Sequence, residues 1–382
     1  MRSSKYAWVF DQLLGERDLG ITSGISLQYF ESPKHKFNII DTPGNSEHIE
    51  DTITGISQAD IGLLVVDSSV GGYEAGIGSH GQTKEHCLLA YTLGVKQMVV
   101  AINKMDDETV NYSEDRWKTI RSEIAAYLKK IGYKPMKIPF IPISGWQGDN
   151  LDSKSICMPW YTGPTLLEAL DNVTCPKRPI NKPLRVPIQG VINTEEIGAV
   201  LGRVESGVLK PGMSIHIAPS GTLGVVESLR INLQTVPQAI PGDIVRINVE
   251  DRSNGLIDIH PGYVLSNYND CPGQEVPCFE AQIIVMKQPE KICEGYNPMM
   301  YCHTSHTPCT FVKIKEKLDR RTGKCLLESS KSVQIGDVCI VEVEPKSRLC
   351  IEQFKDFPAL GRFVIRDLGQ TIAVGVVKTC KR

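Results

Sequence analysis

The chain has 382 residues, of which 41% are apolar and 23% charged, and its formal net charge is -2. This composition fits a globular protein of two or three domains and excludes a polycation that binds nucleic acid over its whole surface. No apolar run approaches the roughly 18 residues of a membrane-spanning helix. The twelve cysteines form no C-x-x-C pair, which indicates reduced thiols, so we expect a cytoplasmic protein with no membrane partner.

The first part of the chain alternates strand and helix signals. Apolar runs of strand length occur at Phe37–Ile40, Ile61–Asp67, Lys96–Ile102 and Phe140–Ile143. Helical patterns lie between them, at Gln82–Tyr91 and Ser113–Ile131. This alternation predicts an α/β domain with a parallel sheet, whose ligands bind where the strands end.

The pattern changes at the proline-rich segment Cys175–Pro179, which we interpret as a linker. Short β-rich runs separated by Pro-Gly turns follow it, and a second boundary falls at Asn269–Gly273. Such spacing indicates antiparallel barrels. We therefore predict an α/β domain over 1–176, a β-barrel over 179–268 and another over 273–382.

Two polar segments follow predicted strands. Asp41-Thr42-Pro43-Gly44 follows the first run, where a carboxylate could hold a magnesium-bound water and a glycine amide could contact a γ-phosphate. An ordinary turn would have the same composition.

Asn103-Lys104-Met105-Asp106 follows the third run. Its aspartate can accept two hydrogen bonds from guanine, a donor pair that adenine lacks. The asparagine can contact the opposite edge of the base, and the lysine stem can pack along it. Ser144-Gly145-Trp146 ends the next strand, where backbone amides could reach the guanine oxygen. These placements favour a guanine site over a solvated loop.

No G-x-x-x-x-G-K-[ST] phosphate loop occurs in the 382 residues. The sequence thus predicts a guanine reader without the usual phosphate cradle. Because charge-assisted hydrogen bonds contribute about 1.5–3 kcal/mol each, we expect weak phosphate binding.

Nearly the whole chain resembles the elongation factor 1-alpha family of translational GTPases. The segments that carry the resemblance are Gly20–Thr22, Asp41–Gly44, Gly81–His86, Asn103–Asp106, Ser144–Trp146, Gly202–Gly212 and Leu360–Phe363. It implies a GTPase that delivers aminoacyl-tRNA to the ribosome. It also implies a guanine-nucleotide exchange factor as partner and a monomeric state, and it places the family's first strand, phosphate loop and first helix before Met1.

The resemblance also assigns roles to residues. Thr22 and Asp41 would bind Mg²⁺, and the GTP/GDP site would comprise Asp41, Thr42, Pro43, Gly44, Asn103, Lys104, Met105, Asp106, Ser144, Gly145 and Trp146. Asn45 stands where the family has a histidine that positions the attacking water. Asparagine cannot carry a proton, so we expect hydrolysis to be slowed roughly tenfold to thousandfold.

Basic residues gather near the end of the chain, and the resemblance implies that they contact tRNA phosphates. The candidates are Lys313, Lys315, Arg320 and Arg366. Solvated lysines on a strand would give the same pattern.

The segment Cys302–Cys309 combines cysteines and histidines. We interpret it as one strand whose side chains alternate between faces, which would separate metal ligands from one another.

Two alternatives to a working elongation factor stay open. One is a catalytically impaired binding protein that serves as a scaffold for tRNA, the exchange factor or the cytoskeleton. The other is a GTPase of the release-factor or ribosome-rescue type.

Overall fold

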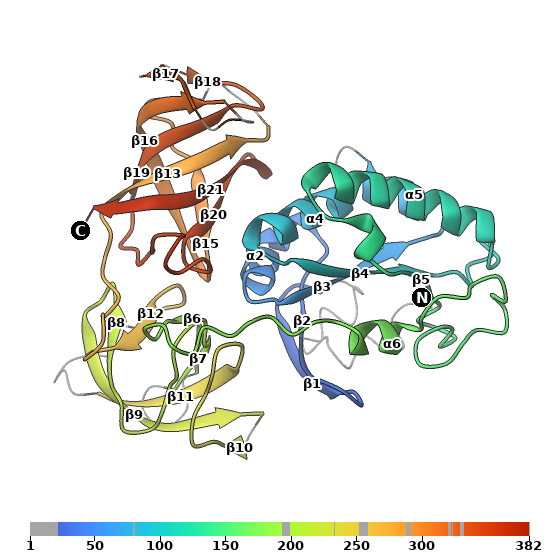
Figure 1. The fold of residues 1–382 in the computed structure, drawn as a ribbon, viewed down its shortest axis with the longest axis horizontal. Coiled ribbons are helices and arrows are strands. Elements are labelled where there is room, and N and C mark those ends of the chain that lie inside the picture. Colours follow the sequence, from blue (N-terminus) through green and yellow to red (C-terminus); the bar gives the residue numbers. More distant parts are fainter. Residues whose placement is uncertain are drawn as a thin grey trace. The chain divides into compact units, whose positions relative to one another are not determined.

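The computed structural model describes residues 22–78, 81–192, 199–232, 234–251, 259–287, 292–319, 322, 324–328 and 332–381. The chain divides into two compact units, the first ending at Pro176 and the second beginning at Lys177. Figure 1 shows mixed helices and strands in the first unit and strands in the second. The structure confirms an α/β domain followed by two antiparallel β-barrels.

Among the described residues, a parallel sheet of three strands organises the first unit. Its order is β3 (Ile61–Asp67), β4 (Gln97–Asn103) and β5 (Phe140–Pro142). The central strand β4 is almost entirely apolar and buried on both faces, as parallel strands require. The register pairs Asp67 with Asn103, so β3 and β4 end side by side.

Helices cover both faces of this sheet. α4 (Gln82–Leu93) and α5 (Glu114–Ile131) lie on one face and α6 (Leu166–Asp171) on the other (Figure 1). Helix α5 begins where the Ser113 hydroxyl accepts the N–H of Arg116 at 3.2 Å, and it ends at Gly132, whose φ is 122°. The shorter helices are η2 (Ser46–His48), α2 (Ile49–Ser57), α3 (Gly72–Ile77) and η3 (Pro135–Lys137).

The prediction that Phe37–Ile40 belongs to the parallel sheet is wrong. This segment lies in β2 (Lys36–Asp41), which pairs antiparallel with β1 (Ser26–Glu31) in a separate two-stranded sheet. The short connection between the two strands allows only antiparallel pairing. Strand β3 consequently forms an edge of the described parallel sheet, and its Leu63 and Val65 are 45% and 56% exposed.

The first barrel closes through six strands of the described chain, in the order β9-β11-β7-β6-β12-β8 and back to β9. Alternate side chains of these strands fill its apolar core. The strands are β6 (Val186–Ile192), β7 (Ala199–Arg203), β8 (Ser214–Ala218), β9 (Thr222–Ile231), β11 (Ile244–Asp251) and β12 (Val264–Asn267), with β10 (Gln234–Thr235) appended to β9.

The second barrel closes in the same way, in the order β15-β20-β21-β13-β19-β16 and back to β15. Its strands are β13 (Cys278–Val285), β15 (Met299–Cys302), β16 (Ser305–Leu318), β19 (Val338–Pro345), β20 (Arg362–Asp367) and β21 (Gln370–Lys381). Strand β17 (Cys325–Glu328) extends the sheet beyond β16, and β14 (Ile292–Cys293) pairs with β18 (Ser332–Val333).

A buried ion pair joins the two barrels. Arg185 precedes β6, and its Nε and Nη2 donate to Oε1 of Glu352 at 2.9 and 2.7 Å. The side chains are 0% and 4% exposed. A further guanidinium nitrogen of Arg185 donates to the carbonyl of Cys271 at 2.9 Å, and the guanidinium lies 4.4 Å from the Phe357 ring centroid. This satisfied network compensates for the desolvation of both charges.

We expect Arg185→Met to lower the free energy of unfolding by about 3–5 kcal/mol, because Glu352 would remain charged and buried without its partner. The measurement is urea unfolding followed by circular dichroism. Lys118→Met is the matched control, since Lys118 forms an exposed pair with Glu114 whose loss costs at most about 1 kcal/mol. Equal losses in the two variants would contradict this account.

Candidate functional site

The predicted guanine-reading segment forms a loop directly after β4. Oδ1 of Asn103 accepts the N–H of Lys104 at 2.7 Å and the N–H of Gly145 at 2.9 Å. The asparagine thus ties its own loop to the loop that follows β5. The structure therefore brings together the two segments that the sequence assigns to the base.

Met105 anchors this loop in the core. Its side chain is fully buried between the sheet and α5. Its N–H donates to the carbonyl of Ile143 at 3.2 Å, and its carbonyl accepts the N–H of Tyr112 at 2.8 Å. The Met105 side chain thus anchors the loop, and the assignment of Met105 to the GTP/GDP site stays a prediction. Lys104 is exposed and Asp106 half-buried on the same loop.

The loop Ser144–Trp146 is a tight turn. The N–H of Ser144 donates to the carbonyl of Asp149 at 3.2 Å, and the Ser144 hydroxyl accepts the N–H of Gln147 at 3.0 Å. The N–H of Gly145 donates to Asn103 and so joins the two loops, whereas the N–H of Ser144 closes its own turn. That backbone amides of this segment reach the guanine oxygen stays a prediction. Trp146 is 36% exposed beside them.

The segment Asp41–Gly44 leaves β2 and runs along α2. The carbonyl of Pro43 accepts the hydroxyl of Thr52 at 2.7 Å. A Cβ at Gly55 would lie 2.3 Å from Cγ2 of Thr42, so the helix approaches the loop closely there. These contacts hold the loop while Gly44 stays exposed.

Asn45 has a local structural role. Its Oδ1 accepts the N–H of Glu47 at 3.3 Å and the hydroxyl of Ser46 at 3.4 Å, so it caps the short helix η2. Asparagine is a favoured residue for this position. The oxygen that could orient a water is therefore already accepting hydrogen bonds from the turn.

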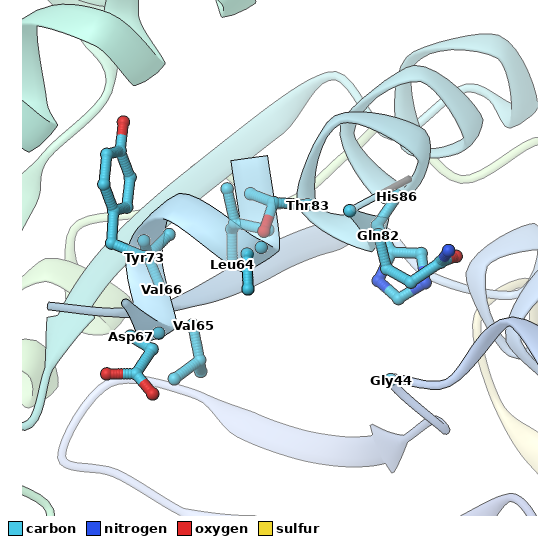
Figure 2. Close-up of a pocket in the computed structure, with 13 residues that line it drawn as sticks. Gly44, Leu64, Val65, Val66, Asp67, Tyr73, Gln82, Thr83 and His86 are labelled. Carbon is cyan, nitrogen blue, oxygen red and sulfur yellow. The ribbon is translucent and has the colours of Figure 1, made fainter. Parts of the chain in front are cut away.

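A pocket of about 420 Å³ lies beside Gly44. Figure 2 shows Gln82 and His86 of α4 projecting toward Gly44, and Asp67 at the end of β3 lies on the other side of the view. Its volume falls within the range of small-molecule sites. The pocket thus connects the end of β3 with the loop that the sequence assigns to a phosphate.

Local sequence patterns do not indicate the contacts that Asp67 and Arg116 make near the end of β3. Arg116 of α5 donates to the carbonyl of Ser68 at 2.9 Å and to Glu74 of α3 at 2.9 Å. This bond holds the pKa of Glu74 near 2. The available signal for Asp67 was its position, since it ends an apolar run just as Asp41 does.

One further residue predicted to bind metal is Thr22. Thr22 is half-buried and precedes β1. No cluster of three or more His, Cys, Asp or Glu side chains suited to a metal occurs among the described residues.

The segment Cys302–Cys309 is a hairpin and not the single strand that we predicted. β15 ends at Cys302, His303 adopts a φ of 43°, and β16 begins at Ser305. Burial lowers the pKa of His303 to about 4. Its Nε2 lies 3.0 Å from the carbonyl of Cys350, to which the neutral ring donates.

The predicted tRNA-contacting residues differ in exposure. Lys313 is exposed on β16. Lys315 forms ion pairs with Glu280 and, at 3.5 Å, with Glu342. Arg366 is only 4% exposed and donates to Thr371 at 2.9 Å and to the carbonyl of Gly369 at 2.7 Å, so its guanidinium is bound at the turn between β20 and β21. Arg320 lies outside the described residues.

No helix within the described part of the chain is long and apolar enough to cross a membrane.

Family models match two parts of the chain. Residues 1–176 match the elongation factor Tu GTP binding domain, and residues 278–378 match the GTP-eEF1A C-terminal domain-like family. Elongation factor 1-alpha of Tetrahymena pyriformis is 49% identical over 381 residues, covering 100% of this chain and 87% of the relative. Its counterpart from Entamoeba histolytica is 50% identical over 378 residues, covering 98% and 85%.

Solved structures share the fold. The GTPase-like domain of Ski7 from S. cerevisiae, bound to GTP, has a TM-score of 0.79 at 21% identity and covers 100% of this chain and 89% of that one. SelB from Methanococcus maripaludis, in complex with the GTP analogue GppNHp, has a TM-score of 0.72 at 19% identity, covering 94% and 74%.

We expect Asn103→Ala to loosen the junction between the two loops. The amide of Gly145 would lose its acceptor and exchange with solvent about 3- to 10-fold faster, the equivalent of one hydrogen bond. Hydrogen exchange by NMR measures this directly. Asn38→Ala, at an exposed position of β2, is the control and should leave the Gly145 amide unchanged. Unchanged exchange in Asn103→Ala would contradict the assignment.

Proposed function

Because the chain belongs to the elongation factor 1-alpha family of translational GTPases, we propose that it binds GTP and GDP where β4 and β5 end. The observation that supports this site best is the side chain of Asn103, which joins the loop after β4 to the loop after β5. A base seated against both loops would be read by residues that the parallel sheet already holds in place.

Asp106 selects guanine in this proposal. Its carboxylate accepts the two hydrogen bonds that guanine donates from N1 and the exocyclic amine, while Met105 fixes the loop from inside the core. Adenine would leave the carboxylate without these donors, which is a costly arrangement in a desolvated site. The stem of Lys104 packs along the base.

The phosphates would extend toward the pocket beside Gly44. The glycines of its wall leave backbone close to a ligand, and Gln82 and His86 project into it. We assign the hydroxyl of Thr22 and the carboxylate of Asp41 to Mg²⁺, since both are the hard oxygen donors that it prefers. When bound, Mg²⁺ supplies neutralisation of phosphate charge.

Hydrolysis by this chain should be slow. Asn45 can hold neither a proton nor a positive charge, and its Oδ1 already caps η2. The proposed cycle is GTP-dependent delivery of aminoacyl-tRNA to the ribosomal A site in the cytoplasm, by a monomer that an exchange factor reloads. Lys313 is our candidate for a tRNA phosphate contact, because it is exposed.

A second candidate function is a scaffold of the same family that binds partners without hydrolysis. The engagement of Asn45 in the η2 cap favours it. GTP turnover at a rate typical of a working GTPase would exclude it. A release-factor or rescue-type role has less support, because the curated relatives reported above are named elongation factor 1-alpha.

The substitution Asp106→Asn tests the proposed base recognition. It replaces one carboxylate oxygen, an acceptor, by an amide N–H, a donor. This donor would face the exocyclic amine of guanine, which is also a donor, but it can bond to the carbonyl that xanthine carries at the same position. We expect GDP affinity to fall about 30-fold or more and affinity for xanthosine diphosphate to rise above it, as measured by calorimetry.

Asp152→Asn is the matched control for this experiment. Asp152 is an exposed aspartate whose carboxylate contacts Ser153 at 3.1 Å, so its substitution should change neither affinity. A similar loss for both nucleotides in Asp106→Asn would contradict the proposed role of the carboxylate, as would a preference for guanine that persists.

A further inference from the structure

The carboxylate of Asp67 reaches from the end of β3 to the guanine-reading loop. Its Oδ2 lies 2.7 Å from Nζ of Lys104. Its Oδ1 accepts the N–H of Ser69 at 2.9 Å and the Ser69 hydroxyl at 2.7 Å. One carboxylate oxygen is therefore fixed by its own loop, and the other is directed at the lysine.

The backbone of Lys104 is held as firmly as its side chain. Its φ is 63°, in the left-handed region that few residues without glycine's freedom adopt. The N–H of Lys104 is bound by Asn103, and the next residue, Met105, is buried. Because both ends of the side chain are fixed, its stem has few conformations left.

A nearby carboxylate does not replace Asp67. Asp107 also lies close enough to Lys104 for the two charges to interact. Its Oδ1, however, accepts the N–H of Thr109 at 2.9 Å and the Thr109 hydroxyl at 2.5 Å, which chiefly lower its pKa. The Thr109 hydroxyl in turn accepts the N–H of Val70 at 3.0 Å.

The fold leaves space for the Asp67 carboxylate at Gly72. A Cβ at Gly72 would lie 2.7 Å from Oδ2 of Asp67 and 2.4 Å from the Ser69 hydroxyl. Any side chain at Gly72 would thus displace the carboxylate. Burial alone would raise the pKa of Asp67, but hydrogen bonds from Lys104 and Ser69 outweigh it and lower the pKa, so the group is ionised at neutral pH.

We propose that Asp67 is a positioning residue for nucleotide binding, which holds the ammonium of Lys104 so that the lysine stem forms one wall of the guanine site. This inference rests on the proposed function. In this proposal the Asp67 carboxylate does not itself contact the base. It affects binding through Lys104, whose stem packs against the purine ring and does not contact the exocyclic amine.

The test compares GDP and inosine diphosphate, which lacks the exocyclic amine, in calorimetric titrations of the full chain. We expect Asp67→Asn to weaken both nucleotides equally, by about 2- to 5-fold, the value of a partly exposed ion pair. In a Lys104→Met background the same substitution should have no further effect. This non-additivity is a result that a merely structural role would not give.

Gly72→Ala provides a second route, because it displaces the carboxylate without removing it, and we expect a similar loss for both nucleotides. The control Asp270→Asn makes the same charge change at an exposed position of the second unit and should leave both affinities unchanged. Circular dichroism checks that each variant folds.

The outcomes separate the two proposals. Unchanged affinity in Asp67→Asn, or an additive loss in the Lys104→Met background, would overturn the role of Asp67 while guanine binding by the wild-type chain stands. Failure of the wild-type chain to bind either nucleotide would overturn the proposed function and the positioning role with it.

Discussion

The parallel register of β3, β4 and β5 is the constraint on which the candidate site depends. It ends β3 and β4 beside each other, at Asp67 and Asn103, and it brings the loop after β5 within reach of the asparagine. Met105 then fixes the guanine-reading loop in the core beneath. Groups that must act together are thereby placed by the backbone of the sheet, which does not need to rearrange when a base arrives.

The barrels depend on a different kind of interaction. Each barrel has its own apolar core. Between the barrels, the buried ion pair of Arg185 and Glu352 lies beside a small apolar cluster formed by Ala218, Val264, Cys350, Phe357 and Leu360. A buried ion pair tolerates few geometries, because each charge needs all of its partners. It therefore restricts how one barrel can sit against the other within the second unit.

Much of this architecture is predictable from local sequence. Continuous apolar runs identified β3 and β4, and the helical pattern over Ser113–Ile131 identified α5. What failed depended on contacts between distant segments. Local sequence patterns do not reveal the antiparallel partner of β2. They also do not reveal the hydrogen bond from the Gly145 amide to Asn103. The pattern of alternating side chains also did not predict the turn at His303, because the residue type alone does not show that a histidine adopts a left-handed conformation.

The central claim is that this edge of the sheet selects guanine. The most direct measurement is calorimetric titration of the wild-type chain with GDP and, separately, with ADP in buffer containing Mg²⁺. The account predicts that GDP binds about 100-fold more tightly or better, because ADP cannot supply the paired donors that Asp106 requires. Equal affinity for the two nucleotides, or no detectable binding of GDP, would contradict it.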